Sequence, residues 1–352
     1  MNDTETKPQN IPSMKPRFFT GLFAAMLLTI PAFGTESDSA GTLDQFQKTF
    51  SVSSGGKLAV DVNVGSIEVA TTSRDEVRVE VYRKAVVRDR SGKRDVAKER
   101  DLLDQNEVSL GQEGQTVTVR GRKREGEKFS HRGSVSLQVR FVVTVPEKFN
   151  ADLKTSGGGI TVVDLAGDLK ARTSGGGLKF ANIQGPIDGH TSGGGIKLTK
   201  CDGTVDVETS GGGIEMSGGS GNASIKTSGG SIQIGSHGGD VVAHTSGGGI
   251  IIVAVEGKLD ASTSGGSVTA TLPGQLPADW RLETSGGGIT VRVPEDATLD
   301  LDASTSGGGV RTDLPVTTDG EQKRGRLKGK INGGGKSLVL RTSAGSIHVK
   351  KL

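Results

Sequence analysis

The sequence repeats the pentapeptide Thr-Ser-Gly-Gly-Gly, or a close variant, at a fixed interval. Seven copies follow one another every 18 residues and three more come at wider intervals; they begin at Thr155, Thr173, Thr191, Thr209, Thr227, Thr245, Thr263, Thr284, Thr305 and Thr342. A period this short cannot hold a pair of helices and is typical of stacked repeats, in which each unit packs only against its neighbours. The repeat therefore predicts an all-β, single-domain, right-handed parallel β-helix with about 18 residues in each coil.

Apolar residues occupy constant positions within the repeat. Counting the threonine as zero, positions five and seven are apolar in each of the seven regular copies, and positions fourteen and sixteen are nearly always so. Alternation with period two indicates strands with one face turned inward. The same alternation points the threonine inward, where its hydroxyl can bond the adjoining glycine-rich turn. Position twelve is glycine in six consecutive coils, which predicts a turn with positive φ; Gly203 is one example.

The outward positions vary from coil to coil. Position seventeen reads Arg172, His190, Glu208, Lys226 and His244 in successive copies. Charges of both signs in one column support the register between strands. We interpret these outward columns as general surface, and the basic clusters Arg120–Arg124 and Lys323–Lys330 as solvated loops.

The chain divides into four segments. Residues 1–34 form an export signal with an apolar run of 13 residues, Phe18–Ile30, and Met14 is an alternative start. A disordered linker is expected over 35–45, an N-terminal cap with degenerate first coils over 46–150, and the repeats with a C-terminal cap over 151–352. Within the cap we expect a coil around Val64–Val69 and a helix over Asp95–Gln105. The last residues, from Ser346, form a final coil or cap.

The overall charge excludes few partners but disfavours nucleic acid. Lys and Arg number 43 against 40 Asp and Glu, a net charge of +3. This balance gives no general attraction to a polyanion such as nucleic acid. Cys201 is the one cysteine, so no intramolecular disulfide forms. It shares a column with Leu165 and Ile183 and is expected to be a buried apolar residue.

Three carboxylates are the strongest candidates for catalysis. Asp188 and Asp206 share one column in adjacent coils, and Asp260 lies further along it. Stacked carboxylates can shift a pKa or bind a cation, as in a carbohydrate-active β-helix enzyme. Such clefts also need aromatic platforms, and the chain has one Trp and one Tyr. We therefore expect no enzyme, and assign no catalytic, cofactor-binding or metal residues and no cofactor.

The histidines do not make a zinc site by their spacing. His190 and His244 share a column but lie three coils apart, and His237 lies on another face. Zinc needs several ligands close together. All three are interpreted as surface histidines.

Longer motifs resemble a known family. They are Val64–Val69 (V-G-S-I-E-V), the segment V-P-E-K-F-N-A-D-L-K-T-S-G-G-G-I from Val145, and L-K-G-K-I-N-G-G-G-K-S-L-V-L-R-T-S-A-G-S-I near the end. Over residues 46–352 the chain resembles the bacterial putative-adhesin family, domain of unknown function 4097. This resemblance implies a parallel β-helix exposed at the cell envelope and brings no catalytic residues.

These observations favour an exported, envelope-associated β-solenoid that acts as a binding, adhesion or scaffold module. The alternatives are a structural or stress-related envelope protein with no dedicated ligand and, less favoured, a carbohydrate-active enzyme. The expected partner is an envelope protein or a glycan, not nucleic acid. After signal cleavage we expect no stable transmembrane segment, in a protein of the periplasm or cell surface whose oligomeric state is left open.

Overall fold

The structure is a computed structural model that describes residues 41–124, 133–318 and 324–352. The predicted export signal, Met14 and most of the predicted linker lie outside these residues. The linker prediction extends too far, because β1 begins at Thr42. Asp44 is held there by the guanidinium of Arg83, and β1 pairs with β4 along its whole length.

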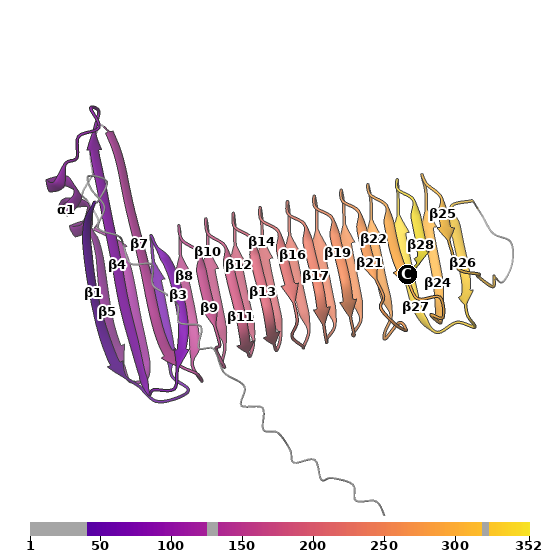
Figure 1. The fold of residues 1–352 in the computed structure, drawn as a ribbon, viewed down its shortest axis with the longest axis horizontal. Coiled ribbons are helices and arrows are strands. Elements are labelled where there is room, and N and C mark those ends of the chain that lie inside the picture. The colour runs from indigo at the N-terminus through magenta and orange to yellow at the C-terminus, as the bar shows by residue number, and fades with distance from the viewer. Residues whose placement is uncertain (1–40, 125–132, 319–323) are drawn as a thin grey trace, which may run out of the picture. The chain divides into compact units, whose positions relative to one another are not determined.

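The described chain from Gly41 onward forms two 14-stranded sheets, whose strands run side by side in Figure 1. The first sheet contains, in spatial order, β1 (Thr42–Ser51), β4 (Glu76–Asp89), β7 (Gly133–Pro146), β3 (Ser66–Thr72), β9 (Ile160–Val163), β11 (Leu178–Gln184), β13 (Ile196–Asp202), β15 (Ile214–Ser217), β17 (Ile232–His237), β19 (Ile250–Val255), β21 (Val268–Thr271), β23 (Ile289–Val293), β28 (Ile347–Lys351) and β25 (Val310–Thr312).

The second sheet contains β26 (Arg326–Ile331), β24 (Leu299–Thr305), β27 (Lys336–Thr342), β22 (Trp280–Thr284), β20 (Leu259–Thr263), β18 (Val241–Thr245), β16 (Ala223–Thr227), β14 (Val205–Thr209), β12 (Ile187–Thr191), β10 (Leu169–Thr173), β8 (Asn150–Thr155), β2 (Lys57–Val62), β6 (Thr116–Lys123) and β5 (Asn106–Glu113). Both basic clusters predicted as loops lie largely in strands, β6 and β26. Each strand there pairs with a neighbour, so the alternating side chains are held in place.

Successive coils pair in parallel and in register. Leu169 lies beside Ile187, which lies beside Val205, so each residue faces the one 18 positions later. The inward positions are buried along both sheets and form one hydrophobic core between them. The all-β parallel stack predicted from the repeat is confirmed.

The repeated threonines join neighbouring coils. Nine of the ten are buried, as predicted from the alternation. The Thr209 hydroxyl donates a hydrogen bond to the carbonyl of Gly194 in the preceding coil, at 2.7 Å. The Gly212 N–H lies 3.4 Å from the same hydroxyl and donates to it. All ten threonines donate in this way to a glycine carbonyl of a neighbouring coil.

The middle glycine of each pentapeptide is required by contact between coils. A Cβ on Gly212 would lie 2.1 Å from the carbonyl oxygen of Gly194. The third position is less confined, since a Cβ on Gly213 would lie 3.0 Å from the nearest carbonyl oxygen. Accordingly serine replaces the third glycine at Ser231, Ser267 and Ser346, whereas the middle position is glycine in all ten copies.

The glycines at position twelve follow the predicted turn only in part. Gly203 has φ +129°, and Gly167, Gly185 and Gly221 are also positive. Gly239 and Gly257 do not belong to this group. Gly239 is nevertheless confined, because a Cβ there would lie 2.0 Å from the carbonyl oxygen of Gly221. Close stacking, as well as backbone conformation, therefore selects glycine in this column.

The C-terminal segment departs from the expected order. β27 pairs with β22 on one side and with β24 on the other, and β28 lies between β23 and β25. The segment from Ser346 is therefore not the terminal coil, because it is inserted into the stack before the Thr305 copy (Figure 1). The Thr305 and Thr342 copies carry the same inward pattern, so spacing alone does not say which adjoins the Thr284 copy.

The N-terminal part adds strands beyond the first coil. β2 and β3 pair with β8 and β9, while β6 and β7 pair with the opposite edges of β2 and β3. The predicted helix is α1 (Val96–Asp104), and the side chain of Asp95 caps it by accepting a hydrogen bond from the Lys98 N–H. Val64, predicted to belong to this first coil, is 41% exposed because it lies in the turn between β2 and β3.

A buried carboxylate ties α1 to the first sheet. Glu99 accepts hydrogen bonds from Thr42, from the backbone of Val87 and from Arg94. Burial alone would raise its pKa, but these hydrogen bonds outweigh that effect and lower the pKa to about 2.

Candidate binding surface

One outward column of the second sheet is rich in cations. The strand register places Arg120, Asp61, Lys154, Arg172, His190, Glu208, Lys226 and His244 side by side in that order. We call this set the basic column. Paired strands lie about 4.8 Å apart, so the column presents charge at a regular interval. The part between Arg120 and His190 has four basic residues and one acid.

A second column lies two residues earlier on the same strands. It contains the carboxylate candidates Asp188 and Asp206, which face each other as predicted. Asp188 is held by Arg172, at 2.8 Å, and by His190, at 2.9 Å. Asp260 lies in the same column but faces Val242 and Arg281 instead of another carboxylate. Asp188 therefore contacts two residues of the basic column.

A groove follows the basic column where the strands of the second sheet end and the chain turns through the pentapeptides. Its volume is about 300 Å³. It is lined by Lys154, Arg172 and His190, by Glu208 at one end, by the adjoining threonines, and by Ser156, Ser174, Ser192 and Ser210. We call it the corner groove. The four serines are exposed and follow successive repeat threonines, so a row of hydroxyls runs beside the basic column along the groove.

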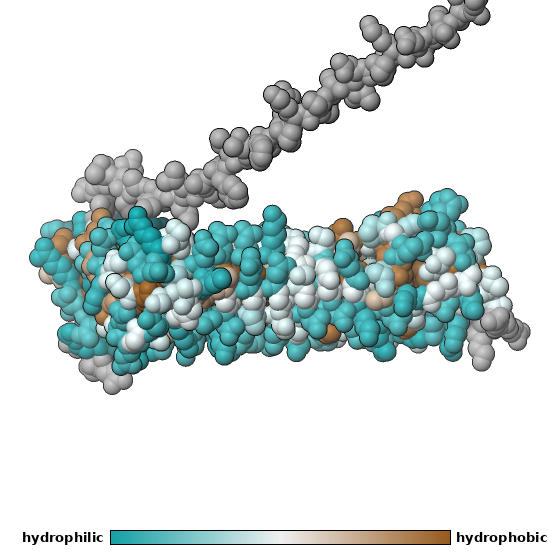
Figure 2. Space-filling model, turned by 90° about the horizontal axis from the view of Figure 1, so that it is seen from below, coloured by the Kyte–Doolittle hydropathy of each residue, from teal (hydrophilic) through white to brown (hydrophobic). Residues whose placement is uncertain are grey.

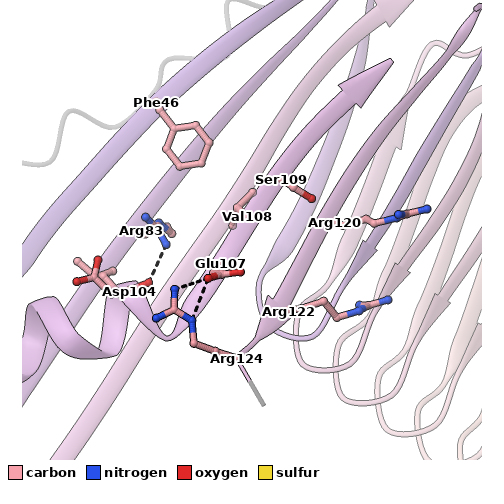
Figure 3. A pocket seen from close by; sticks show the side chains of 10 residues that line it. Phe46, Arg83, Asp104, Glu107, Val108, Ser109, Arg120, Arg122 and Arg124 are labelled. Carbon is pink, nitrogen blue, oxygen red and sulfur yellow. Dashed lines mark hydrogen bonds and ion pairs between the residues drawn. The ribbon is translucent and has the colours of Figure 1, made fainter. Parts of the chain in front are cut away.

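A larger groove of about 650 Å³ lies in the N-terminal part (Figure 3). Phe46 of β1 and Arg83 of β4 line it with the end of α1, Glu107–Ser109 of β5, and Arg120, Arg122 and Arg124 around the end of β6. We call it the cap groove. Arg124 donates to Glu107 at 3.0 Å, and Arg83 donates to the Leu103 carbonyl at 2.9 Å.

Asp61 lies between residues of the two grooves. Arg122 of the cap groove forms an ion pair with Asp61, which lowers the pKa of that carboxyl and raises the pKa of the Arg122 guanidinium. In the strand register Asp61 lies between Arg120 of the cap groove and Lys154 of the corner groove. Figure 3 shows Arg120 and Arg122 extending away from Arg83 and Arg124, on the side of the following strands.

The structure does not gather the other candidates into a site. Cys201 is buried beside Ile183, as predicted, and burial raises the pKa of its thiol. His237 was predicted at the surface, but it is buried and its Nε2 lies 2.7 Å from the Gly221 carbonyl. It occupies the inward column of Cys201, a position that the repeat register defines. His190 and His244 remain apart, and the described residues contain no group of three potential metal ligands.

Apolar residues form only small patches on the face shown in Figure 2, which is largely hydrophilic. The exposed large apolar side chains of the coils are Val242, Ile251 and Val253. Single exposed apolar residues are normal on soluble proteins. Among the described residues, no helix has the length and apolarity needed to span a membrane.

Several solved structures are similar to this chain at low identity. A "putative cell adhesion protein" from Clostridium sporogenes is 11% identical, with 88% of this chain and 100% of that chain covered and a TM-score of 0.24. A "putative adhesin" from Bacteroides fragilis is 12% identical, with 88% and 97% covered and a TM-score of 0.31. A "putative lipid binding protein" from Parabacteroides distasonis is 12% identical, with 89% and 98% covered and a TM-score of 0.35.

A search of the curated proteins finds no match to this chain. The model of the family described as Toastrack DUF4097 matches residues 56–350, from the first coil to the inserted C-terminal strand. That span contains all ten pentapeptides, both paired sheets of coils and most of the two grooves. The chain therefore belongs to the Toastrack DUF4097 family.

Proposed function

We propose that this protein is an exported binding module of the cell envelope and that its second sheet carries the ligand-binding face. The observation that carries the proposal is the basic column. The cap groove lies at its Arg120 end, and the corner groove follows it along Lys154, Arg172 and His190. The cations come from consecutive coils whose backbones are hydrogen-bonded together, so their spacing is set before a ligand arrives.

The coil-to-coil bonds make this face rigid. Thr155, Thr173 and Thr191 lie directly beside the corner groove and donate to glycine carbonyls of the preceding coils. A rigid surface loses little conformational freedom on binding. Lys154 and Arg172 project from strands immediately before these threonines, and their backbone positions are therefore fixed.

Binding fits the charged groups better than catalysis does. A hydrolase of the two-carboxylate type needs one acid with a raised pKa beside an ionised partner. Asp188 instead contacts Arg172 and His190, so its carboxylate is already engaged by basic side chains. A structural envelope protein with no ligand is the second candidate.

A glycan array with the purified, signal-processed protein tests the proposal. We expect saturable binding to a subset of glycans. The Asp188→Asn/Asp206→Asn variant should bind at least as well as the wild type, because it removes negative charge beside the basic column, and neither protein should cleave a polyuronate. Turnover that the double substitution abolishes would replace binding with catalysis. The absence of binding to any glycan or envelope protein would favour the structural candidate.

Export is tested separately. We expect fractionation of the source cells to place the protein in the periplasm or on the surface, with an N-terminus near Thr35 by mass spectrometry. A cytoplasmic protein that retains residues 1–34 would contradict this part of the proposal.

A further inference from the structure

We infer that the cap groove and the corner groove form one continuous track that binds a linear acidic polysaccharide lying along the stack, across the strands. This inference rests on the proposed binding function and specifies its ligand. The track runs over five neighbouring strands, β6, β2, β8, β10 and β12, through Arg120, Asp61, Lys154, Arg172 and His190.

The charge along the track favours an anion. Arg122 neutralises Asp61, and Asp188 is shared by Arg172 and His190. Arg120 and Lys154 are exposed. The charge excess is therefore concentrated at the place where the two grooves meet. The track ends at Glu208, whose carboxylate would repel the next anionic group.

The spacing favours a linear polymer over a compact anion. Each strand of the track contributes one residue to the basic column, and neighbouring strands lie about 4.8 Å apart. A chain of acidic sugars also carries one carboxylate at each step, and an extended chain can place successive carboxylates against successive coils. A single phosphate group would contact one coil and leave the basic residues of the other coils unused.

Neutral groups on the track complement a sugar. Ser156, Ser174 and Ser192 place one exposed hydroxyl beside the basic residue of each successive coil. A hydroxyl both donates and accepts hydrogen bonds, as the hydroxyls of a sugar do. At the cap end, half-buried Phe46 lines the groove, and the Arg83 guanidinium lies 5.6 Å from its ring centroid. An aromatic ring there can pack against the apolar face of one sugar.

Oligogalacturonates of increasing length are the probe for this inference. Their affinity for the whole protein, measured by calorimetry, should rise with chain length and stop rising once the chain spans the five strands. Affinity should also fall as salt is added, because exposed ion pairs are screened. A neutral oligoglucoside of equal length should bind at least tenfold more weakly.

The test variant is Lys154→Gln/Arg172→Gln, and the matched control is Lys179→Gln/Lys197→Gln on the first sheet. Each removes two exposed cations, one of which is ion-paired: Arg172 with Asp188, and Lys197 with Glu215. We expect about a tenfold loss of affinity for the test variant, the loss of two charge contacts of roughly 0.7 kcal/mol each. The control should bind as the wild type does, and both should keep its thermal midpoint.

The outcomes separate this inference from the proposed function. Oligogalacturonate binding that is weakened equally by both variants would overturn the track. Binding that does not depend on chain length would assign a compact anion instead of a polymer. If the array detects only neutral glycans or an envelope protein, the acidic-polymer inference fails while the binding function stands.

Discussion

Substitution of one middle glycine tests how the coils are held together. Gly212 lies in the centre of the stack, and a Cβ added there would lie 2.1 Å from the Gly194 oxygen, 2.4 Å from the Gly194 carbon and 2.5 Å from the Gly195 nitrogen. All three atoms belong to the backbone, so no side chain can rotate to relieve the contact. In the Gly212→Ala variant the two coils must therefore move apart.

The cost follows from the bonds that such a movement disturbs. Overpacking a well-packed site costs about 1–3 kcal/mol when side chains can adjust. Here separation also stretches bonds that span the same gap, those of the Thr209 hydroxyl to Gly194 at 2.7 Å and of the Gly211 N–H to Ser192 at 2.9 Å. Each net hydrogen bond contributes about 1 kcal/mol. We therefore expect Gly212→Ala to lower the free energy of unfolding by about 3 kcal/mol or more.

Chemical denaturation followed by circular dichroism measures this loss, and the neighbouring glycine provides the control. Gly213→Ser introduces a residue that the chain already has at the equivalent Ser231 and Ser267. Its cost should stay below about 1 kcal/mol, since a Cβ there is only moderately confined. Equal stability of the two variants, or a Gly212→Ala protein as stable as the wild type, would show that the middle glycine does not set the distance between coils.

Three further changes probe the threonine ladder, the buried carboxylate and the inserted strands. Thr209→Val keeps the shape but removes the donor to Gly194, so it should lower stability by about 1–3 kcal/mol in denaturation; an unchanged midpoint would argue against the ladder. The pKa of Glu99 is about 2 in the folded protein and 4.5 without its partners, so its contribution of about 3 kcal/mol is present above pH 4.5 and lost as the pH falls towards 2. Acid titration of unfolding should show this loss in the wild type and not in Glu99→Gln. Deletion of residues 336–352 removes the strands between β22 and β24, so it should lower the thermal midpoint and make the Thr305 copy susceptible to limited proteolysis; a protease-resistant Thr305 copy would show that it can stack directly on β22.

The stacking of coils could be predicted because one periodic pattern fixes both the strands and their register. Thr209, for example, recurs at the same position in every coil, and its alternation with apolar neighbours already turned it inward. The requirement for the middle glycine was less visible. It depends on how closely two backbones approach, which becomes clear only when Gly212 is placed against Gly194. The serines at Ser231, Ser267 and Ser346 were the signal in the sequence that the third position is less confined.

The order of the last coils could not be predicted, because the Thr305 and Thr342 copies have equivalent patterns. Both can pair with the same kind of edge, and the choice depends on contacts of the intervening segment, including the antiparallel pairing of β26 with β24. The prediction of a final coil or cap from Ser346 is therefore wrong, because β28 lies between β23 and β25.

The candidate surface was partly visible in the sequence. Arg172 and His190 were recognised in one outward column, but they were interpreted as support for the register. Arg120 and Asp61 lie outside the regular repeat, so only the pairing of β6 with β2 and of β2 with β8 extends the column to them. The regular column of Asp188 and Asp206 made them candidates for catalysis. The basic residues that contact Asp188 come from the neighbouring column.

The claim that successive coils act together as one binding track is tested most directly by a crystal structure of the protein with an oligogalacturonate. We expect a sugar chain that crosses the strands of the second sheet, with successive carboxylates within about 4 Å of the side-chain nitrogens of Lys154 and Arg172. A chain bound on the first sheet, or one that lies parallel to the strands and contacts a single coil, would contradict it.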